Sequence, residues 1–269
     1  MKRLLFFLMI ILGMTTTVAF GQKKETRPVS GFTGIDASSM FDITVSKGDK
    51  ESLVIEADDE VMPYVRSEVK NGVLNLYLDN YKTENNKKVY ILRAVIVMKN
   101  LDKVSLSGVC KLTTTDLFSP DKFKVDCSGA TSMTVNVSTN QLNIETSGVC
   151  NIQIKAAVAG DTKMDISDAS KISGELQTAN VVFSSSGVSA VELTGSATSI
   201  KMKVAGTSKV IAENFTVKNA DIVSSGTSII KVNATDALKV SSSGAASVNY
   251  KGSPAVQINS SEAARVTKI

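Results

Sequence analysis

The sequence predicts an all-β protein, a right-handed parallel β-helix (solenoid) of about nine or more coils of 18–21 residues with an irregular N-terminal cap. Three observations lead to this prediction. One short phrase recurs at nearly constant spacing, the apolar residues around it alternate with polar ones, and the 43% hydrophobic content includes no Trp. Alternation is the period of a strand. Recurrence of the phrase in phase indicates stacked coils, because antiparallel hairpins would not make it recur at constant spacing. Crossovers between parallel strands are almost always right-handed, which predicts the hand of the helix.

The recurring phrase is a corner motif that begins as LSGVCKL and continues as CSGATSM and TSGVCNI. Successive centres of the motif are 18–21 residues apart. The centres are Gly108, Gly129, Gly148, Asp168, Gly187, Gly206, Gly226, Gly244 and Glu262. Glycine permits the positive φ and the close backbone approach of a sharp corner. The seven glycines are therefore predicted to be structural.

The residues around each centre form aligned columns. Residues four positions before and four positions after the centre are apolar in every repeat. The earlier column runs Val104, Val125, Ile144, Met164, Phe183, Met202, Ile222, Val240 and Ile258. Residues two positions after the centre are small, and they run Cys110, Thr131, Cys150, Ser170, Ser189, Ser208, Ser228, Ala246 and Ala264. Even offsets thus face the core and odd offsets face solvent, with coils about 4.8 Å apart.

The first 21 residues resemble a secretory signal peptide. Lys2 and Arg3 precede an apolar run too short to span a bilayer, and Ala19-Phe20-Gly21 offers a cleavage site before Gln22. The expected divisions are residues 1–21 as signal peptide, 22–104 as N-terminal strands and cap, and 105–269 as regular coils, with one continuous domain over 30–269. No later run of about 18 apolar residues exists, so no transmembrane segment is expected in the mature chain.

The N-terminal third is less regular than the rest. Residues 33–45 fit one coil centred on Ser39, and the acids of Asp58-Asp59-Glu60 suit the first turn of a helix. The further expectations are strands over 53–57, 73–78 and 89–98, a short helix over 58–69 and a polar turn over 79–88. We interpret this region as the start of the solenoid with a cap over its first open edge, because unpaired edges invite other chains.

The repeated serine–glycine corners and the signal peptide together resemble a bacterial family of autotransporter adhesin head domains, also called the GIN domain and common in Bacteroides-like bacteria. The resemblance covers about residues 30–269. It implies a β-helical fold and an exported location, in the periplasm or at the cell surface. The motif is specific for the fold and gives no information about chemistry.

Composition excludes several functions. Histidine is absent, which removes the commonest general base and metal ligand. The signal peptide carries two of the 30 basic residues and none of the 26 acidic ones, so the mature chain is near neutral and nucleic acid is not an expected partner. Cys110, Cys127 and Cys150 are expected to be small buried hydrophobes, with a Cys110–Cys127 disulfide as the alternative. The inward serines from Ser170 to Ser228 are expected to bond to one another and to corner backbone groups.

One row of acids is the candidate ligand-binding site. Asp126, Glu145 and Asp165 occupy the outward position three residues before the centre in consecutive coils. Lysines occupy the outward position two residues earlier, as Lys103, Lys124 and Lys163. A calcium site or an acid/base pair for glycan cleavage are two functional interpretations. We favour a solvated acidic row neutralised by the lysines, so no cofactor is expected and calcium stays open.

These observations favour an exported, non-enzymatic binding or adhesin-like protein of the bacterial envelope. Its partner would be an envelope protein or a glycan, and homo-oligomerisation is left open. The alternatives are a polysaccharide-acting β-helix enzyme, which fold analogy alone supports, and a structural periplasmic protein that self-associates.

Overall fold

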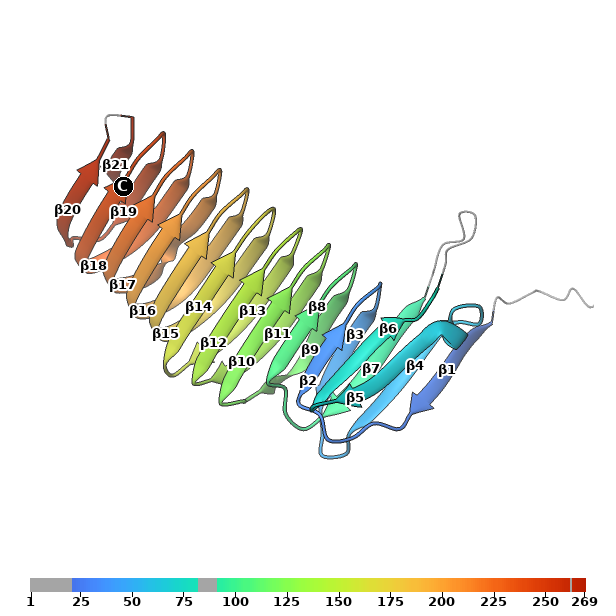
Figure 1. Ribbon diagram of the computed structural model, residues 1–269. Coiled ribbons are helices and arrows are strands. Elements are labelled where there is room, and N and C mark those ends of the chain that lie inside the picture. The colour runs from blue at the N-terminus through green and yellow to red at the C-terminus, as the bar shows by residue number, and fades with distance from the viewer. Residues whose placement is uncertain (1–20, 82–90, 262) are drawn as a thin grey trace, which may run out of the picture.

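The repeats form successive turns of a parallel β-solenoid that stack into a rod, which confirms the predicted fold class (Figure 1). The computed structural model describes residues 21–81, 91–261 and 263–269. We call the strands that lead into the glycine corners face one, and the strands that leave those corners face two. The corners line up along one edge of the rod (Figure 1).

The strands alternate between the two faces. Face one contains β2 (Gly34–Ala37), β8 (Lys103–Leu106), β10 (Lys122–Cys127), β12 (Gln141–Thr146), β14 (Asp161–Ile166) and β20 (Ala255–Ser260). Face two contains β3 (Asp42–Lys47), β9 (Lys111–Phe118), β11 (Ser132–Thr139), β13 (Asn151–Val158), β19 (Ser247–Lys251) and β21 (Arg265–Lys268). Four long strands continue from face two into face one, namely β15 (Lys171–Ser185), β16 (Ala190–Val204), β17 (Lys209–Ser224) and β18 (Ile229–Ser242).

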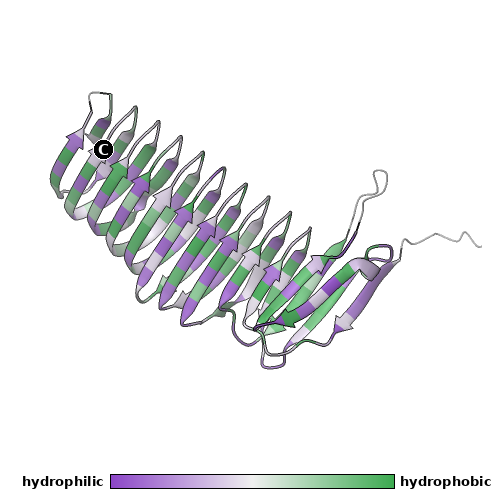
Figure 2. Ribbon diagram, viewed as in Figure 1, coloured by the Kyte–Doolittle hydropathy of each residue, from purple (hydrophilic) through white to green (hydrophobic). Residues whose placement is uncertain are grey.

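Equivalent residues of successive coils lie side by side in the core. Val125 is in register with Val104 and Ile144, and Ile144 is in register with Met164. All four side chains are fully buried. Figure 2 shows the resulting alternation of hydrophobic and hydrophilic residues along the strands. Each such side chain stabilises the fold by about 1.5–3 kcal/mol through burial.

The glycine corners adopt the predicted left-handed conformation, with φ between 69° and 94°. Ser39 and Asp168 adopt it as well, at φ 78° and 58°. Each corner also bonds to the preceding one: the Ala130 N–H donates to the Gly108 carbonyl at 2.7 Å. A Cβ added at Gly129 would lie 2.5 Å from that same carbonyl oxygen. Close backbone stacking therefore leaves no room for a side chain at this position.

The cap does not follow the order of the sequence. β2 and β3 form the predicted coil around Ser39, but this coil does not end the rod. β6 (Val73–Leu78) pairs in parallel with β2, and β7 (Leu92–Met98) pairs in parallel with β3. These later strands thus lie outside the earlier coil, and β8 and β9 continue the rod on its other side.

Antiparallel strands then close this end. β5 (Val65–Lys70) pairs with β6, β4 (Ser52–Asp58) pairs with β7, and β1 (Gln22–Arg27) pairs with β4. The strands predicted over 53–57 and 73–78 are confirmed, as is the strand over 89–98 from Leu92 onward. Residues 82–90, which include most of the predicted polar turn, lie outside the described residues.

The helix predicted over 58–69 is wrong. A single 3-10 turn, η1 (Met62–Tyr64), is followed directly by β5. β5 pairs with β6 along six residue pairs, from Val65 opposite Leu78 to Lys70 opposite Val73. This pairing covers the exposed edge of β6, and it outweighs the weak helix signal of three acidic residues.

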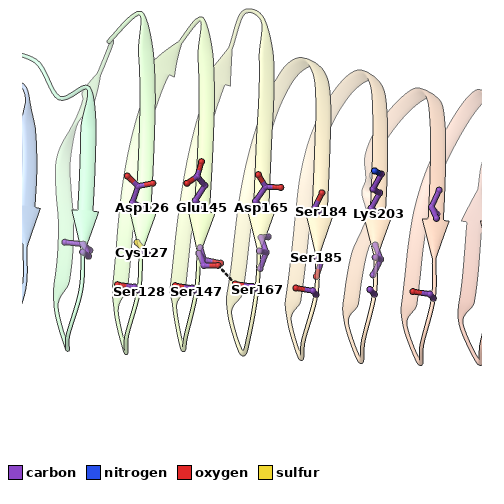
Figure 3. Close-up of a pocket in the computed structure, with 18 of the residues that line it drawn as sticks. Asp126, Cys127, Ser128, Glu145, Ser147, Asp165, Ser167, Ser184, Ser185 and Lys203 are labelled. Atoms are coloured by element: carbon purple, nitrogen blue, oxygen red, sulfur yellow. Dashed lines mark hydrogen bonds between the residues drawn. The ribbon is translucent and has the colours of Figure 1, made fainter.

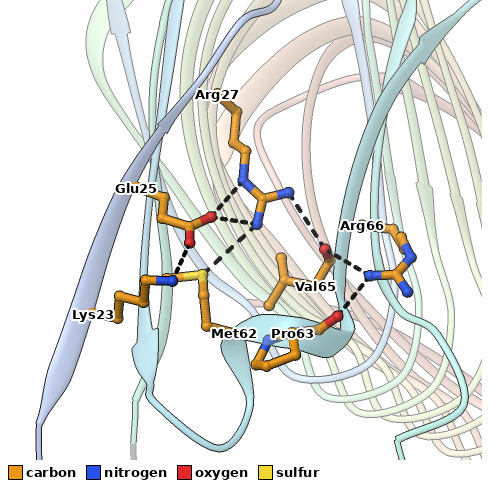
Figure 4. Close-up of polar contacts among 7 residues, drawn as sticks. All are labelled: Lys23, Glu25, Arg27, Met62, Pro63, Val65 and Arg66. Atoms are coloured by element: carbon orange, nitrogen blue, oxygen red, sulfur yellow. Dashed lines mark hydrogen bonds and ion pairs between the residues drawn. The ribbon is translucent and has the colours of Figure 1, made fainter.

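Arg27 joins the two edge strands of the cap (Figure 4). Its guanidinium donates to the Val65 carbonyl on β5 at 3.4 Å. Glu25 holds the same guanidinium from β1, with 3.0 Å between Nε and Oε2, and Lys23 pairs with Glu25 at 2.8 Å. β5 extends face one through β6, and β1 extends face two through β4 and β7. These side-chain contacts therefore connect the two faces, since β1 and β5 do not pair through their backbones.

The coil at the far end is less well buried. Ile258 belongs to a column that is buried in the other coils, yet it is 46% exposed, and Val256 is 40% exposed. β20 pairs with β18, and no described strand covers its other side. Glu262, the predicted centre of this coil, lies outside the described residues.

The predicted signal peptide falls almost wholly on residues 1–20, which lie outside the described residues. β1 begins at Gln22, directly after the predicted cleavage site. Within residues 21–81, 91–261 and 263–269, no helix is long and apolar enough to cross a membrane.

The three cysteines are free and buried, so the disulfide alternative is wrong and the interpretation as small core residues is confirmed. Thr131 Oγ1 donates to the Cys150 sulfur at 3.4 Å, and the Cys150 thiol donates to the Ser147 carbonyl at 3.3 Å. Burial raises the pKa of the Cys110 thiol, and it raises that of Cys127 to about 12.

We expect Gly129→Ala to destabilise the rod by about 2–5 kcal/mol, because the positive φ costs about 1–2 kcal/mol and overpacking adds about 1–3 kcal/mol. Gly31→Ala is the matched control, since Gly31 has φ 72° but no atom within 4 Å of the added Cβ. Urea unfolding measures both free energies. Equal losses would show that corner contact between coils contributes nothing.

We expect Cys127 to resist alkylation by iodoacetamide at about pH 8, because the thiolate is the reactive species. A pKa of about 12 and 4% exposure keep the group protonated and covered. Mass spectrometry should detect its labelling only when urea unfolds the chain. Rapid labelling of Cys127 in the native protein would contradict this burial.

Candidate functional site

The predicted acidic row is present on face one, at one wall of a shallow groove of about 740 Å³ (Figure 3). Asp126 on β10 is in register with Glu145 on β12, which is in register with Asp165 on β14. The strands hold the three carboxylates in one line because successive coils pair in strict parallel register. Figure 3 shows the carboxylates side by side along the rod.

The same row continues beyond the acids. Asp165 is in register with Ser184, and Ser184 with Lys203. The row thus changes from negative to neutral to positive along the rod. Ser184 and Lys203 were not among the predicted site residues, although both stand three positions before a repeat centre and the column alignment could have found them.

Serine hydroxyls form the other wall of the groove. They occupy the position directly before every repeat centre except Gly206, which Ala205 precedes, and the groove is lined by Ser128, Ser147, Ser167, Ser186 and Ser225. In Figure 3 the labelled members of this row run parallel to the acidic row. Ser167 Oγ donates to the Thr146 carbonyl at 2.8 Å. The repeated phrase contains this serine in nearly every coil, but the sequence interpretation treated it only as part of the corner.

Lysines on the same face neutralise the acids, as predicted. Asp126 contacts Lys103 at 3.5 Å and Lys124 at 3.1 Å, and Lys124 also reaches Glu145 at 3.6 Å. Lys163 pairs with Asp165. The hydrogen bond from Lys124 to Asp126 raises the pKa of that lysine, with the charges of Asp126 and Glu145 acting in the same direction.

The carboxylates do not converge on a common point. Among the residues that the structure describes, no group of three or more Cys, Asp or Glu side chains could hold a metal ion. Strand pairing spaces the acids about 4.8 Å apart along a line, and a calcium ion needs six to eight oxygens around one centre. The geometry therefore offers no support for the calcium interpretation.

Glycan cleavage fits this row equally poorly. The two carboxyl groups of a glycosidase flank the scissile bond, with one donating a proton and the other attacking or activating water. Asp126, Glu145 and Asp165 all project from the same side of one face. They would meet a glycan chain from one side only.

The inward serines form a separate, buried network, which confirms the prediction for Ser170, Ser189 and Ser208 but not for Ser228. Ser189 Oγ donates to Ser208 Oγ at 3.0 Å, and Ser185 contacts both hydroxyls. Ser170 Oγ donates to the Ser167 carbonyl at 3.1 Å. Ser228 Oγ is buried without a hydrogen-bond partner among the described residues. Ser170, Ser189, Ser208 and Ser228 lie inside the corner and belong to the core, whereas Ser185 also lines the groove.

Comparison with known proteins assigns the rod to a family. The signature of the family described as "Putative auto-transporter adhesin, head GIN domain" matches residues 31–160 and again residues 143–254. The chain belongs to the GIN domain family. The double match agrees with a repeat that runs through most of the GIN domain chain. None of the curated proteins matches it.

Three solved structures share the GIN domain rod. A "putative adhesin" from Parabacteroides merdae is 18% identical, covers 92% of this chain and 96% of its own, and superposes with a TM-score of 0.68. A "putative adhesin" from Parabacteroides distasonis is 19% identical, with coverage of 93% and 98% and a TM-score of 0.69. A "Putative lipid binding protein" from the latter organism is 18% identical, with coverage of 92% and 96% and a TM-score of 0.64. At these identities the likeness shows the fold alone.

We expect Glu145→Gln to change the free energy of unfolding by less than about 1 kcal/mol, because solvent screens a half-exposed ion pair. The carboxylate is 3.6 Å from Lys124 and its side chain is 44% exposed. Thermal unfolding with and without calcium measures the effect. A calcium-dependent rise in the melting temperature of the native protein that the variant lacks would instead support a metal site.

Proposed function

We propose that this GIN domain chain is an exported, non-enzymatic, adhesin-like protein that binds an extended polar ligand along the face-one groove, and that this ligand is a glycan chain. The observation that carries the proposal is the pair of parallel rows, with charged side chains on one wall and serine hydroxyls on the other, running over successive coils. Membership of a family described as an adhesin head agrees with export and with a binding role.

The energetics favour a long ligand over a small one. A hydrogen bond between a solvated hydroxyl and a ligand contributes only about 0.5–1.5 kcal/mol. The groove is shallow, so no single coil encloses a ligand. Useful affinity must come from several coils at once, and a chain molecule that runs along the rod can contact Ser128, Ser147 and Ser167 together.

The groove also has a direction. Its charged wall is acidic at Asp126, Glu145 and Asp165 and basic at Lys203. The lysines beside the acids already neutralise much of the negative charge. A ligand rich in hydroxyl groups suits such a surface better than a highly charged polymer, because it can both donate to the carboxylates and accept from serine and lysine.

A glycan array probed with the chain from residue 22 onward tests this function. Ser128→Tyr with Ser167→Tyr fills the groove, whereas Thr134→Tyr with Ser173→Tyr places the same bulk on face two of the same two coils. The groove variant should lose signal about tenfold or more, equivalent to about 1.4 kcal/mol, while the control should match the native protein. Equal thermal unfolding of all three would show that both variants fold.

Two results would contradict the proposal. The first is a blank array with native protein, and the second is equal loss in the groove and control variants. Sedimentation of the same samples distinguishes the structural alternative. A mass that rises with concentration, together with a blank array, would favour a self-associating rod.

A further inference from the structure

The corner edge of the rod carries an exposed apolar row separate from the groove. Val109, Val149 and Val188 are 63%, 62% and 66% exposed, more than any other large hydrophobic side chain in the described part of the chain. All three stand directly after a repeat centre. Ala130 and Ala169 hold the same position in the two intervening coils and are also exposed. We call these five residues the corner ridge.

The ridge is convex because of the corner geometry. Each corner turns sharply through a left-handed residue at the edge of the rod, so the next side chain projects outward. The valines occur in alternate coils, and the ridge spans four coil spacings, or roughly 19 Å. Three large apolar groups held in line at one edge are more than scattered surface hydrophobes.

Unpaired lysines flank the ridge on its face-two side. Lys111, Lys171 and Lys209 stand at the first positions of β9, β15 and β17. Lys111 and Lys171 follow the ridge residues Val109 and Ala169 by two positions, and Lys209 lies in the coil next to that of Val188. All three are exposed, and none forms an ion pair with any described residue. This differs from face one, where Lys103, Lys124 and Lys163 are all paired with acids.

One acid shares the position of these lysines, since Asp42 in the coil of Ser39 is in register with Lys111, although no ion pair joins them. The register neighbours of Lys171 and Lys209 are the uncharged residues Asn151, Ala190 and Ile229. The serine row borders the ridge on its other side. Asp168 lies at a corner within the ridge, but its Oδ2 accepts a hydrogen bond from the Gly148 N–H. Asp126 and its neighbours stand one row farther away and are neutralised by lysines. The edge therefore sets three lysines against the two carboxylates of Asp42 and Asp168, and it is apolar with a small excess of positive charge.

We propose that the corner ridge docks on an anionic lipid surface, with the valines at the boundary between headgroups and acyl chains and the lysines at the headgroup phosphates. This surface is independent of the glycan groove. A convex line of short apolar side chains needs a soft partner and not a matching cleft, and interfacial binding combines apolar burial with attraction to anionic lipids. Each lysine near such a surface adds attraction that salt screens.

Vesicle co-sedimentation tests the ridge. The chain from residue 22 onward is used, because the apolar run in residues 1–21 would itself partition into lipid. We expect it to sediment with vesicles of one part phosphatidylglycerol to two parts phosphatidylcholine at low salt, and not with pure phosphatidylcholine. Two triple variants should each lower the partition coefficient about tenfold or more. The first combines Val109→Ser, Val149→Ser and Val188→Ser. The second combines Lys111→Ser, Lys171→Ser and Lys209→Ser.

The matched control removes the same charge elsewhere. Lys122, Lys201 and Lys239 are exposed on face one and form no ion pair with a described residue. Their combined change to Ser should leave the partition within about twofold of native. The proposal is overturned if the native protein stays in the supernatant with both vesicle types. It is also overturned if the control variant loses as much partitioning as the ridge variants, or if the valine variant loses none. Unchanged thermal unfolding confirms that each variant folds.

Discussion

The rest of the structure depends on the backbone stacking of the corners. Each residue after a corner donates its N–H to the corner carbonyl of the preceding coil, as Val149 does to Gly129 at 2.7 Å. This bond holds the coils at one strand spacing, and a side chain at the glycine would block it. Because every coil must satisfy the same contact, every coil keeps the same phase. The inward columns, the small residues behind the corner and the outward rows all follow from that repetition.

The regular coils could be predicted because the same packing constraint acts in every coil and so selects the same residue types at the same positions. The apolar columns were found by aligning on the glycines, and Val125, Ile144 and Met164 lie in register as expected. The cap could not be predicted in the same way. There the chain turns back, so that β6 and β7 lie outside the earlier coil of β2 and β3. Nothing local in residues 73–98 shows on which side of that coil they stack, since the pairing partners are distant in sequence.

The candidate site was predicted in part for a related reason. The row of Asp126, Glu145 and Asp165 was visible because carboxylates are conspicuous in an outward column. Its continuation to Lys203 and the serine row opposite were missed because serine beside glycine also suits a corner. The serine before a corner thus has two roles: the backbone turn favours its small side chain, and the groove uses its hydroxyl. The sequence indicates the first role, and only the stacked structure shows that the hydroxyls form one wall.

Charge is segregated by row, which composition conceals. Lysines and acids are nearly balanced in number, yet they are not evenly paired. On face one the two signs stand in adjacent columns and neutralise each other, as Lys124 does between Asp126 and Glu145. Two columns past the corner, Lys171 and Lys209 have no acid in register beside them. In a solenoid a column offset of two residues moves a charge to another surface, so one repeat can present a neutral polar groove and a basic apolar edge without conflict. A globular protein would need separate elements for these two surfaces.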